Sequence, residues 1–229
     1  RLLLMMSMIT LLLLVAALSL ARQRPHHRAR SRPVARVFKG YNDTEGKYPY
    51  VVALVANIYR VCTGSLIAPN WVLTAAHCDR PDVEAVQYGN MSVHPAKSTT
   101  KRKIIQFVNP ANFDEHKLYM GPYMQDIALA RIVELEMAVY GRISCLGEGG
   151  VSACPKKKWN FLPSICVTPR CDNIDQQIMN GDSGGPLMYD GKIVGVASST
   201  HPMKLTAFAP ISPYLDWIQN TMANYVDLS

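Results

Sequence analysis

The chain is organised around the stretch Asn180-Gly181-Asp182-Ser183-Gly184-Gly185-Pro186. Small residues on both sides of Ser183 let the backbone turn sharply and let a second molecule approach closely. Such a turn can direct the Ser183 hydroxyl outward and bring the amide N–H groups of Gly181 and Ser183 to one point. An acyl-transfer site needs this combination of a nucleophile and paired oxyanion donors. Taken alone, the G-x-S-x-G pattern is at least as typical of a glycine-rich surface turn.

Two stretches upstream contain the residues that would complete such a site. In Leu73-Thr74-Ala75-Ala76-His77-Cys78, the neutral imidazole could take the Ser183 proton and give it to a leaving group. In Gln125-Asp126-Ile127-Ala128-Leu129-Ala130, a buried Asp126 carboxylate could accept the Nδ1–H of His77 and hold its tautomer. Taken alone, His77 could equally be a structural histidine beside a cysteine, and Asp126 an ordinary aspartate at the edge of a strand.

Short apolar runs separated by turn signals predict an all-β protein. The runs lie at residues 48–56, 61–67, 71–74, 104–108, 127–133, 187–189 and 192–197. Asp190-Gly191 is typical of a two-residue hairpin turn between the last two runs. The segment Ile211 to Met222 has helical spacing of its apolar residues, with Ser212 as a possible cap and Pro213 in the first turn.

The motifs TAAHC, DIAL and GDSGGP, in that order, resemble the chymotrypsin-like serine protease family. The resemblance runs over residues 37–229 and implies two packed antiparallel six-stranded β-barrels, about 37–143 and 144–229, with a C-terminal α-helix. It implies that His77 is the general base, Asp126 its orienting partner and Ser183 the nucleophile. The N–H groups of Gly181 and Ser183 would form the oxyanion hole. Protein or peptide substrates and protein inhibitors are the implied partners, and no metal or cofactor is needed.

The N-terminal residues indicate a secreted, extracellular protein without stable membrane association. Leu2 to Ala21 is almost continuously apolar and ends in Ser19-Leu20-Ala21, which predicts a signal peptide over residues 1–21. A signal anchor is the alternative, since about 20 apolar residues can just span a bilayer. The six cysteines also favour an oxidising compartment.

The next segment, residues 22–36, is basic and contains little that a core could bury, so it is expected to be disordered. A basic tail for a membrane surface or a polyanion is one interpretation, and a propeptide is favoured because of the sequence that follows Arg36. Residues 1–36 hold seven Arg and no acid, whereas residues 37–229 hold 17 basic and 17 acidic residues. The neutral body gives no reason to expect nucleic-acid binding. Arg36-Val37-Phe38-Lys39-Gly40 resembles the family's activation junction. The resemblance implies that an activating protease cuts after Arg36 and that the new Val37 α-ammonium pairs with Asp182.

The expected substrate pocket differs from that of the digestive trypsins. Where those members carry an aspartate six positions before the serine, this chain has Gln177, so basic side chains are not expected as substrates. The segment Val194 to Thr200 resembles the substrate-binding segment and includes Ser198. Thr200 and Thr206 correspond to pocket-wall positions that are often glycine. These residues together predict a preference for small or uncharged P1 side chains.

The second barrel departs most from the family pattern. Asp126 and Ser183 are 57 positions apart, and the shortening falls between Cys145 and Cys166. A truncated second barrel is therefore expected, and the alternative function is a catalytically impaired homologue that binds partners. The resemblance implies a Cys62–Cys78 disulfide. Cys145, Cys154, Cys166 and Cys171 leave three connectivities open, of which Cys154–Cys166 is favoured.

Two sequons remain outside this site. Asn42-Asp43-Thr44 and Asn90-Met91-Ser92 are glycosylation acceptors in a secreted protein. Unmodified surface loops are an equally good interpretation of both.

Overall fold

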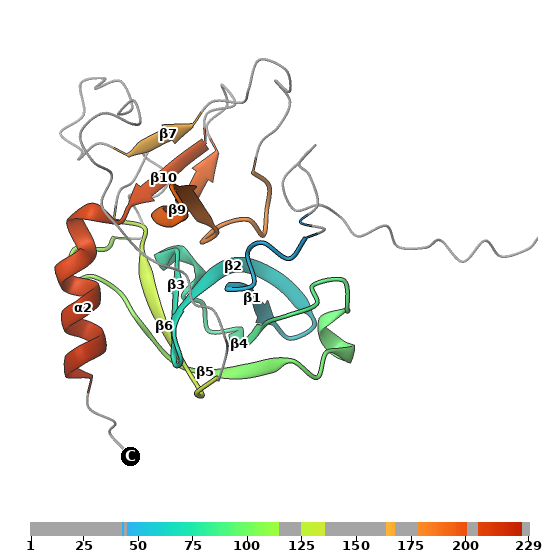
Figure 1. The fold of residues 1–229 in the computed structure, drawn as a ribbon. Coiled ribbons are helices and arrows are strands. Elements are labelled where there is room, and N and C mark those ends of the chain that lie inside the picture. The colour runs from blue at the N-terminus through green and yellow to red at the C-terminus, as the bar shows by residue number, and fades with distance from the viewer. Residues whose placement is uncertain are drawn as a thin grey trace, which may run out of the picture. The chain divides into compact units, whose positions relative to one another are not determined.

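The computed structural model describes residues 43, 45–114, 125–135, 164–167, 178–200 and 206–225. These residues form β-strands, short 3-10 helices and a C-terminal α-helix (Figure 1). The strands are β1 (Val51–Ala56), β2 (Tyr59–Ala68), β3 (Trp71–Thr74), β4 (Val83–Gln87), β5 (Lys101–Val108), β6 (Ala128–Ile132), β7 (Ile165–Val167), β8 (Pro186–Tyr189), β9 (Lys192–Thr200) and β10 (Thr206–Pro210). The helices are η1 (Ala76–Cys78), η2 (Pro95–Lys97), η4 (Ser212–Tyr214) and α2 (Leu215–Asn224).

The first six strands close into an antiparallel barrel in the order β1-β2-β3-β6-β5-β4. Closure pairs both edges of the sheet, which removes the exposed edges that open sheets must protect. Apolar strand residues such as Leu54, Leu66 and Leu129 are fully buried within it. The predicted all-β fold and the first barrel are confirmed.

The C-terminal half contains an antiparallel sheet with the order β7-β10-β9-β8. Asp190 and Gly191 join β8 to β9 with φ values of 46° and 68°. Positive φ at both central residues defines the type I′ turn that suits the twist of a hairpin, so the predicted hairpin is confirmed. Within the described residues this sheet has four strands, whereas a complete second barrel would have six. Residues 145–163, where the sequence is expected to be shorter than in the family, lie outside the described residues.

The predicted apolar runs match strands β1, β2, β3, β5, β6, β8 and β9, whereas β4, β7 and β10 were not predicted. The sequence of β4, VEAVQ, has a charged residue within a short segment and gives only a weak apolar pattern. The sequence of β10, TAFAP, contains small residues and ends in proline. Pairing with neighbouring strands determines both segments more than their own propensity does.

The C-terminal helix begins later than the sequence predicts. Ser212 is the first residue of η4, Tyr214 occupies the N-cap position of α2, and neither helix has a side-chain capping bond. The prediction of Ser212 as a helix cap is therefore wrong. The chain enters the helix through a tight turn in which the Tyr214 N–H donates to the Ile211 carbonyl at 2.8 Å. None of the helices in the described part of the chain is long and apolar enough to cross a membrane.

Helix α2 is anchored to the first barrel, beside which it lies in Figure 1. Ile218 is fully buried and belongs to the same apolar cluster as the barrel residues. Just beyond the helix, the Tyr225 ring packs edge-on against Trp71 of β3, with 5.3 Å between centroids. The Arg131 guanidinium of β6 lies 4.4 Å from the Tyr225 ring centroid. One continuous core thus joins the barrel to the C-terminal segment.

Candidate active site

Strand pairing brings His77 and Asp126 together although 49 positions separate them. Thr74, the last residue of β3, pairs with Ala128, the first residue of β6. His77 lies in η1, just after β3, and Asp126 lies just before β6. Because the strands are antiparallel, the segment after one strand and the segment before the other leave the barrel at the same end. The register of β3 and β6 therefore determines this pair.

Asp126 holds His77 through two hydrogen bonds. The His77 backbone N–H donates to Asp126 Oδ1 at 2.9 Å, and His77 Nδ1 lies 2.7 Å from Asp126 Oδ2. The carboxylate is fully buried, whereas the His77 side chain is 25% exposed. Since the carboxylate accepts from Nδ1–H, the neutral ring presents the lone pair of Nε2 on its other side. The imidazole is thus fixed in orientation and tautomer.

Ser198 provides a third contact to the same carboxylate, which sequence reasoning did not identify. Its Oγ donates to Asp126 Oδ2 at 2.5 Å, and the residue is buried on β9. The sequence assigned Ser198 to the substrate pocket, which stays a prediction, and the structure adds that its hydroxyl is directed at Asp126. No local pattern signals this contact, because it joins residues 72 positions apart. It connects the second sheet directly to the His77–Asp126 pair.

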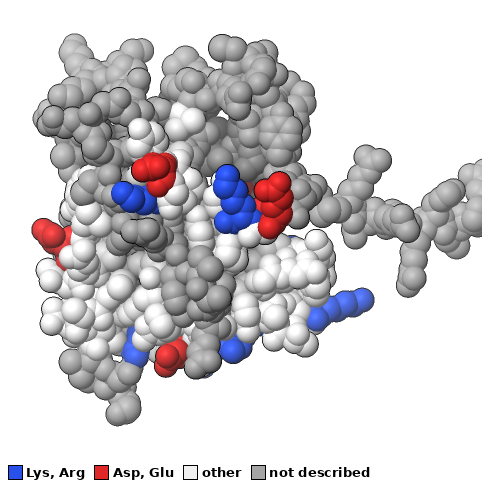
Figure 2. All heavy atoms as spheres, in the orientation of Figure 1, with Lys and Arg blue, Asp and Glu red and all other residues white. Residues whose placement is uncertain are grey.

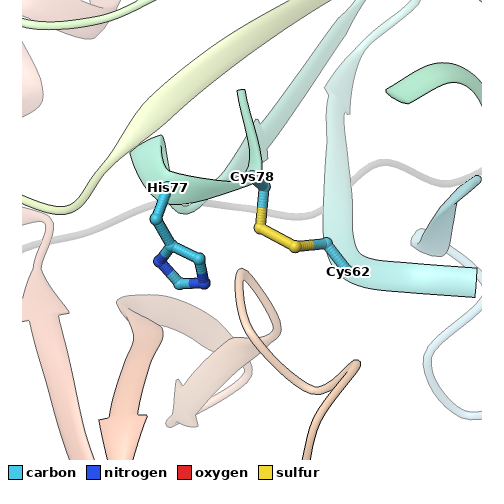
Figure 3. A group of neighbouring side chains, drawn as sticks. All are labelled: Cys62, His77 and Cys78. Atoms are coloured by element: carbon cyan, nitrogen blue, oxygen red, sulfur yellow. A yellow bond between two sulfur atoms is a disulfide. The ribbon is translucent and has the colours of Figure 1, made fainter. Parts of the chain in front are cut away.

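The predicted disulfide between Cys62 and Cys78 is present and buried. Figure 3 shows it beside the His77 ring, with Cys62 coming from β2 and the other two residues from η1. The donor atoms of Cys62, His77 and Cys78 lie within 4.8 Å of one another, a spacing that would suit a metal ion. The two sulfurs are bonded to each other, however, and provide no thiolate ligands. The bond instead fixes η1 to the neighbouring strand.

The nucleophile stretch begins with a tight turn over Met179 to Asp182. The Asp182 N–H donates to the Met179 carbonyl at 3.0 Å, and Gly181, the third residue, has φ of 99°. A positive φ at the third position alone is the feature of a type II turn, which requires glycine there. The buried Asp182 side chain accepts the Met179 N–H at 2.7 Å and closes the turn from the other side. We call residues 179–185 the nucleophile turn.

The rest of the nucleophile turn is bonded to both halves of the protein. The Ser183 carbonyl accepts the Thr63 N–H from β2, and the Gly184 N–H donates to Ala197 on β9, each at 2.7 Å. The Ser183 carbonyl oxygen also lies 3.8 Å from Cys78 Sγ, adjacent to His77. Among the described residues, the N–H groups of Gly181 and Ser183 have no hydrogen-bond acceptor. These are the two donors that the sequence assigned to an oxyanion hole.

Position 184 requires a glycine because strands β2 and β3 of the barrel approach it closely. Its φ is 84°, and a Cβ there would lie 2.1 Å from the Thr63 carbonyl oxygen and 2.2 Å from Thr74 Oγ1. Any side chain would therefore force the nucleophile turn away from β2. The glycine allows the contact between barrel and nucleophile turn in which the Ser183 carbonyl meets Thr63 and Cys78.

The predicted substrate pocket is described only in part. Thr200 and Thr206 are direct partners between β9 and β10, and the Thr206 side chain is buried. The side chain of Thr200 is not among the described atoms. Gln177, Arg36 and Val37 lie outside the described residues. Their roles in specificity and activation therefore remain predictions.

Comparison with known proteins identifies the class that this fold and site define. The family model described as Trypsin matches residues 37–158 and 163–218. Serine protease SP24D of Anopheles gambiae is 28% identical, with 83% of each chain covered. Serine protease 1 of Drosophila melanogaster is 29% identical over 83% of this chain and 87% of its own. The chain belongs to the trypsin family, and it is by class a serine endopeptidase.

Solved structures confirm the fold. Mouse neuropsin, a serine protease, aligns with a TM-score of 0.59 at 21% identity, covering 76% of this chain and 95% of its own. Human heparin binding protein aligns with a TM-score of 0.61 at 18% identity, covering 82% and 97%. The resemblance to the chymotrypsin-like family drawn from the three motifs is therefore confirmed.

Gly184→Ala is expected to destabilise the protein by about 3 kcal/mol or more, because it combines a left-handed backbone with severe overpacking. Gly191→Ala is the matched control. Gly191 also has a positive φ, of 68°, but a Cβ there meets nothing within 4 Å. The control is expected to cost about 1–2 kcal/mol. Urea unfolding of both variants measures the difference, and equal losses would contradict the close approach at Gly184.

Proposed function

We propose that the protein is a secreted endopeptidase that cleaves peptide bonds with His77, Asp126 and Ser183. The observation that carries the proposal is the convergence of three elements. Asp126 holds the His77 ring from behind, and the nucleophile turn lies against the disulfide beside that ring. Two N–H groups of the same turn have no acceptor among the described residues.

In this mechanism Ser183 Oγ attacks the carbonyl carbon of the substrate, and its proton passes to His77 Nε2. The carbonyl oxygen becomes an oxyanion that accepts the N–H groups of Gly181 and Ser183. His77 then gives its proton to the leaving amine, the C–N bond breaks, and an acyl-enzyme remains. Water, deprotonated by His77, attacks the acyl carbon and releases the carboxylic acid and free Ser183.

Asp126 supports both proton transfers without itself becoming protonated. Its negative charge stabilises the imidazolium that forms when His77 takes the proton. The Ser198 hydroxyl and the His77 backbone N–H donate hydrogen bonds to the carboxylate that replace those of water. A buried carboxylate needs such donors, because its removal from water is otherwise costly.

The full chain cut after Arg36 is expected to react covalently with a fluorophosphonate probe, because the probe requires an activated serine and an assembled oxyanion hole. Ser183→Ala is expected to abolish labelling without loss of folding. Labelling is measured by gel fluorescence and located by peptide mass spectrometry. A folded, cleaved wild-type protein that stays unlabelled would favour a binding homologue without catalysis.

We further propose that the protein is a zymogen, with a signal peptide at residues 1–21 and a propeptide at 22–36. Asp182 supports this proposal, since its buried carboxylate closes the turn that carries the Gly181 N–H. A Val37 α-ammonium delivered to Asp182 would act directly on the geometry of this turn. Its positive charge would also form an ion pair with the buried carboxylate.

Arg36→Gln, which blocks cleavage, is expected to lower the rate of probe labelling at least about 100-fold, as expected when oxyanion donors are displaced. A matched variant replaces residues 32–36 with an enteropeptidase site and keeps Val37 as the first residue after the cut. Its labelling should rise to the wild-type rate only after cleavage. Equal labelling of cut and uncut protein would contradict a zymogen.

The specificity that we propose is for small or uncharged P1 residues. Its support is the absence of an acidic residue at position 177 together with the paired positions 200 and 206. Profiling of the cut enzyme on a peptide library is expected to show cleavage after small uncharged residues. Gln177→Asp should shift cleavage towards Arg and Lys, because it supplies a carboxylate for a basic side chain. Wild-type cleavage after Arg or Lys would contradict the proposal.

A further inference from the structure

Thr63 on β2 makes several contacts with the nucleophile turn. Its backbone N–H donates to the Ser183 carbonyl at 2.7 Å. Its side-chain Oγ1 donates to the Gly181 carbonyl, also at 2.7 Å. Gly181 and Ser183 are the two residues whose N–H groups have no acceptor among the described residues. Each proposed oxyanion donor therefore belongs to a residue whose carbonyl is bonded to Thr63.

Thr63 is itself held in place by the barrel. Its carbonyl accepts the Thr74 hydroxyl of the neighbouring strand β3 at 2.8 Å. Its preceding neighbour Cys62 is fixed by the disulfide to Cys78. Thr63 is 7% exposed, so water competes little for its hydrogen bonds. A rigid strand thus presents two donors to an irregular turn.

The hydroxyl bond joins Thr63 to Gly181, whose backbone has the conformational freedom of a glycine. Gly181 has a φ of 99° that only glycine adopts readily. The Gly181–Asp182 peptide is held at its N–H by Met179 and at its carbonyl by Thr63. With that peptide plane fixed, the Gly181 Cα is fixed as well, and the donor N–H can change direction only through φ and ψ of Gly181. Loss of the hydroxyl would free the carbonyl end of the peptide.

We propose that Thr63 is a positioning residue, whose side-chain hydroxyl fixes the oxyanion donor of Gly181. The catalytic part of this inference rests on the proposed function, whereas the hydrogen bond between the Thr63 hydroxyl and the Gly181 carbonyl does not depend on it. The Thr63 N–H bond to Ser183 persists with any non-proline residue at this position. Only the hydroxyl bond to Gly181 depends on the side chain, and it joins residues 118 positions apart.

Two variants separate the hydroxyl from the methyl group. Thr63→Val keeps the branched shape and removes the hydroxyl, whereas Thr63→Ser keeps the hydroxyl and removes the methyl group. In the cut enzyme, Thr63→Val is expected to lower kcat and the affinity for a peptide aldehyde inhibitor about 10-fold, with KM nearly unchanged. Thr63→Ser is expected to remain within about 3-fold of wild type.

Thr100→Val is the matched control for the loss of a threonine hydroxyl. Thr100 Oγ1 also donates to a backbone carbonyl at 2.7 Å, that of Tyr88 in the first barrel. Thr100→Val is expected to leave kcat unchanged, because the bond that it removes holds no residue of the nucleophile turn. If Thr63→Val folds poorly, Thr63→Ala removes the same hydroxyl without added bulk, and its comparison with Thr63→Ser decides the question.

Amide hydrogen exchange provides a readout that does not require catalysis. The N–H groups of Asp182, Gly184 and Gly185 are all hydrogen-bonded within or next to the nucleophile turn. Their exchange should accelerate in Thr63→Val and remain at the wild-type rate in Thr63→Ser and Thr100→Val. A wild-type protein without fluorophosphonate labelling would overturn the proposed function, while exchange still decides the role of Thr63. Unchanged exchange and unchanged kcat in Thr63→Val would overturn the inference.

Discussion

The buried carboxylate of Asp126 is the constraint on which the rest of the site depends. It accepts three hydrogen bonds, from the His77 backbone, the His77 ring and the Ser198 hydroxyl. Burial of a carboxylate without such donors is costly, so loss of any one of them is expected to destabilise the folded protein. Two donors come from the first barrel and one from β9. The geometry of the candidate site and the packing of the two halves are therefore stabilised by the same bonds.

The two halves make different contributions to the site. The closed barrel β1-β2-β3-β6-β5-β4 provides rigid positions for His77, Asp126 and Thr63. The second sheet contributes Ser198 and the Ala197 carbonyl that accepts the Gly184 N–H. A functional site mounted on regular strands keeps its geometry better than one mounted on loops alone. The nucleophile turn is irregular, and it obtains its precision from hydrogen bonds to strands on both sides.

Charges of both signs lie on the face of the molecule drawn in Figure 2. On the face drawn in Figure 2, the described Lys and Arg side chains are scattered among Asp and Glu. An interspersed surface of this kind does not steer one sign of ligand strongly.

Local patterns in the sequence correctly predicted the family, the Cys62–Cys78 disulfide and seven of the strands. The same kind of pattern led to His77, Asp126 and Ser183 as the candidate site residues. The weak patterns of β4 and β10 did not predict strands, since neighbouring strands supply the pairing that defines them. The contacts of Ser198 with Asp126 and of Thr63 with Gly181 could be found only in the folded structure. Their partners lie 72 and 118 positions away, and a serine or threonine hydroxyl bonds equally well to many acceptors. Which acceptor each one meets depends on the packing of the second sheet against the barrel.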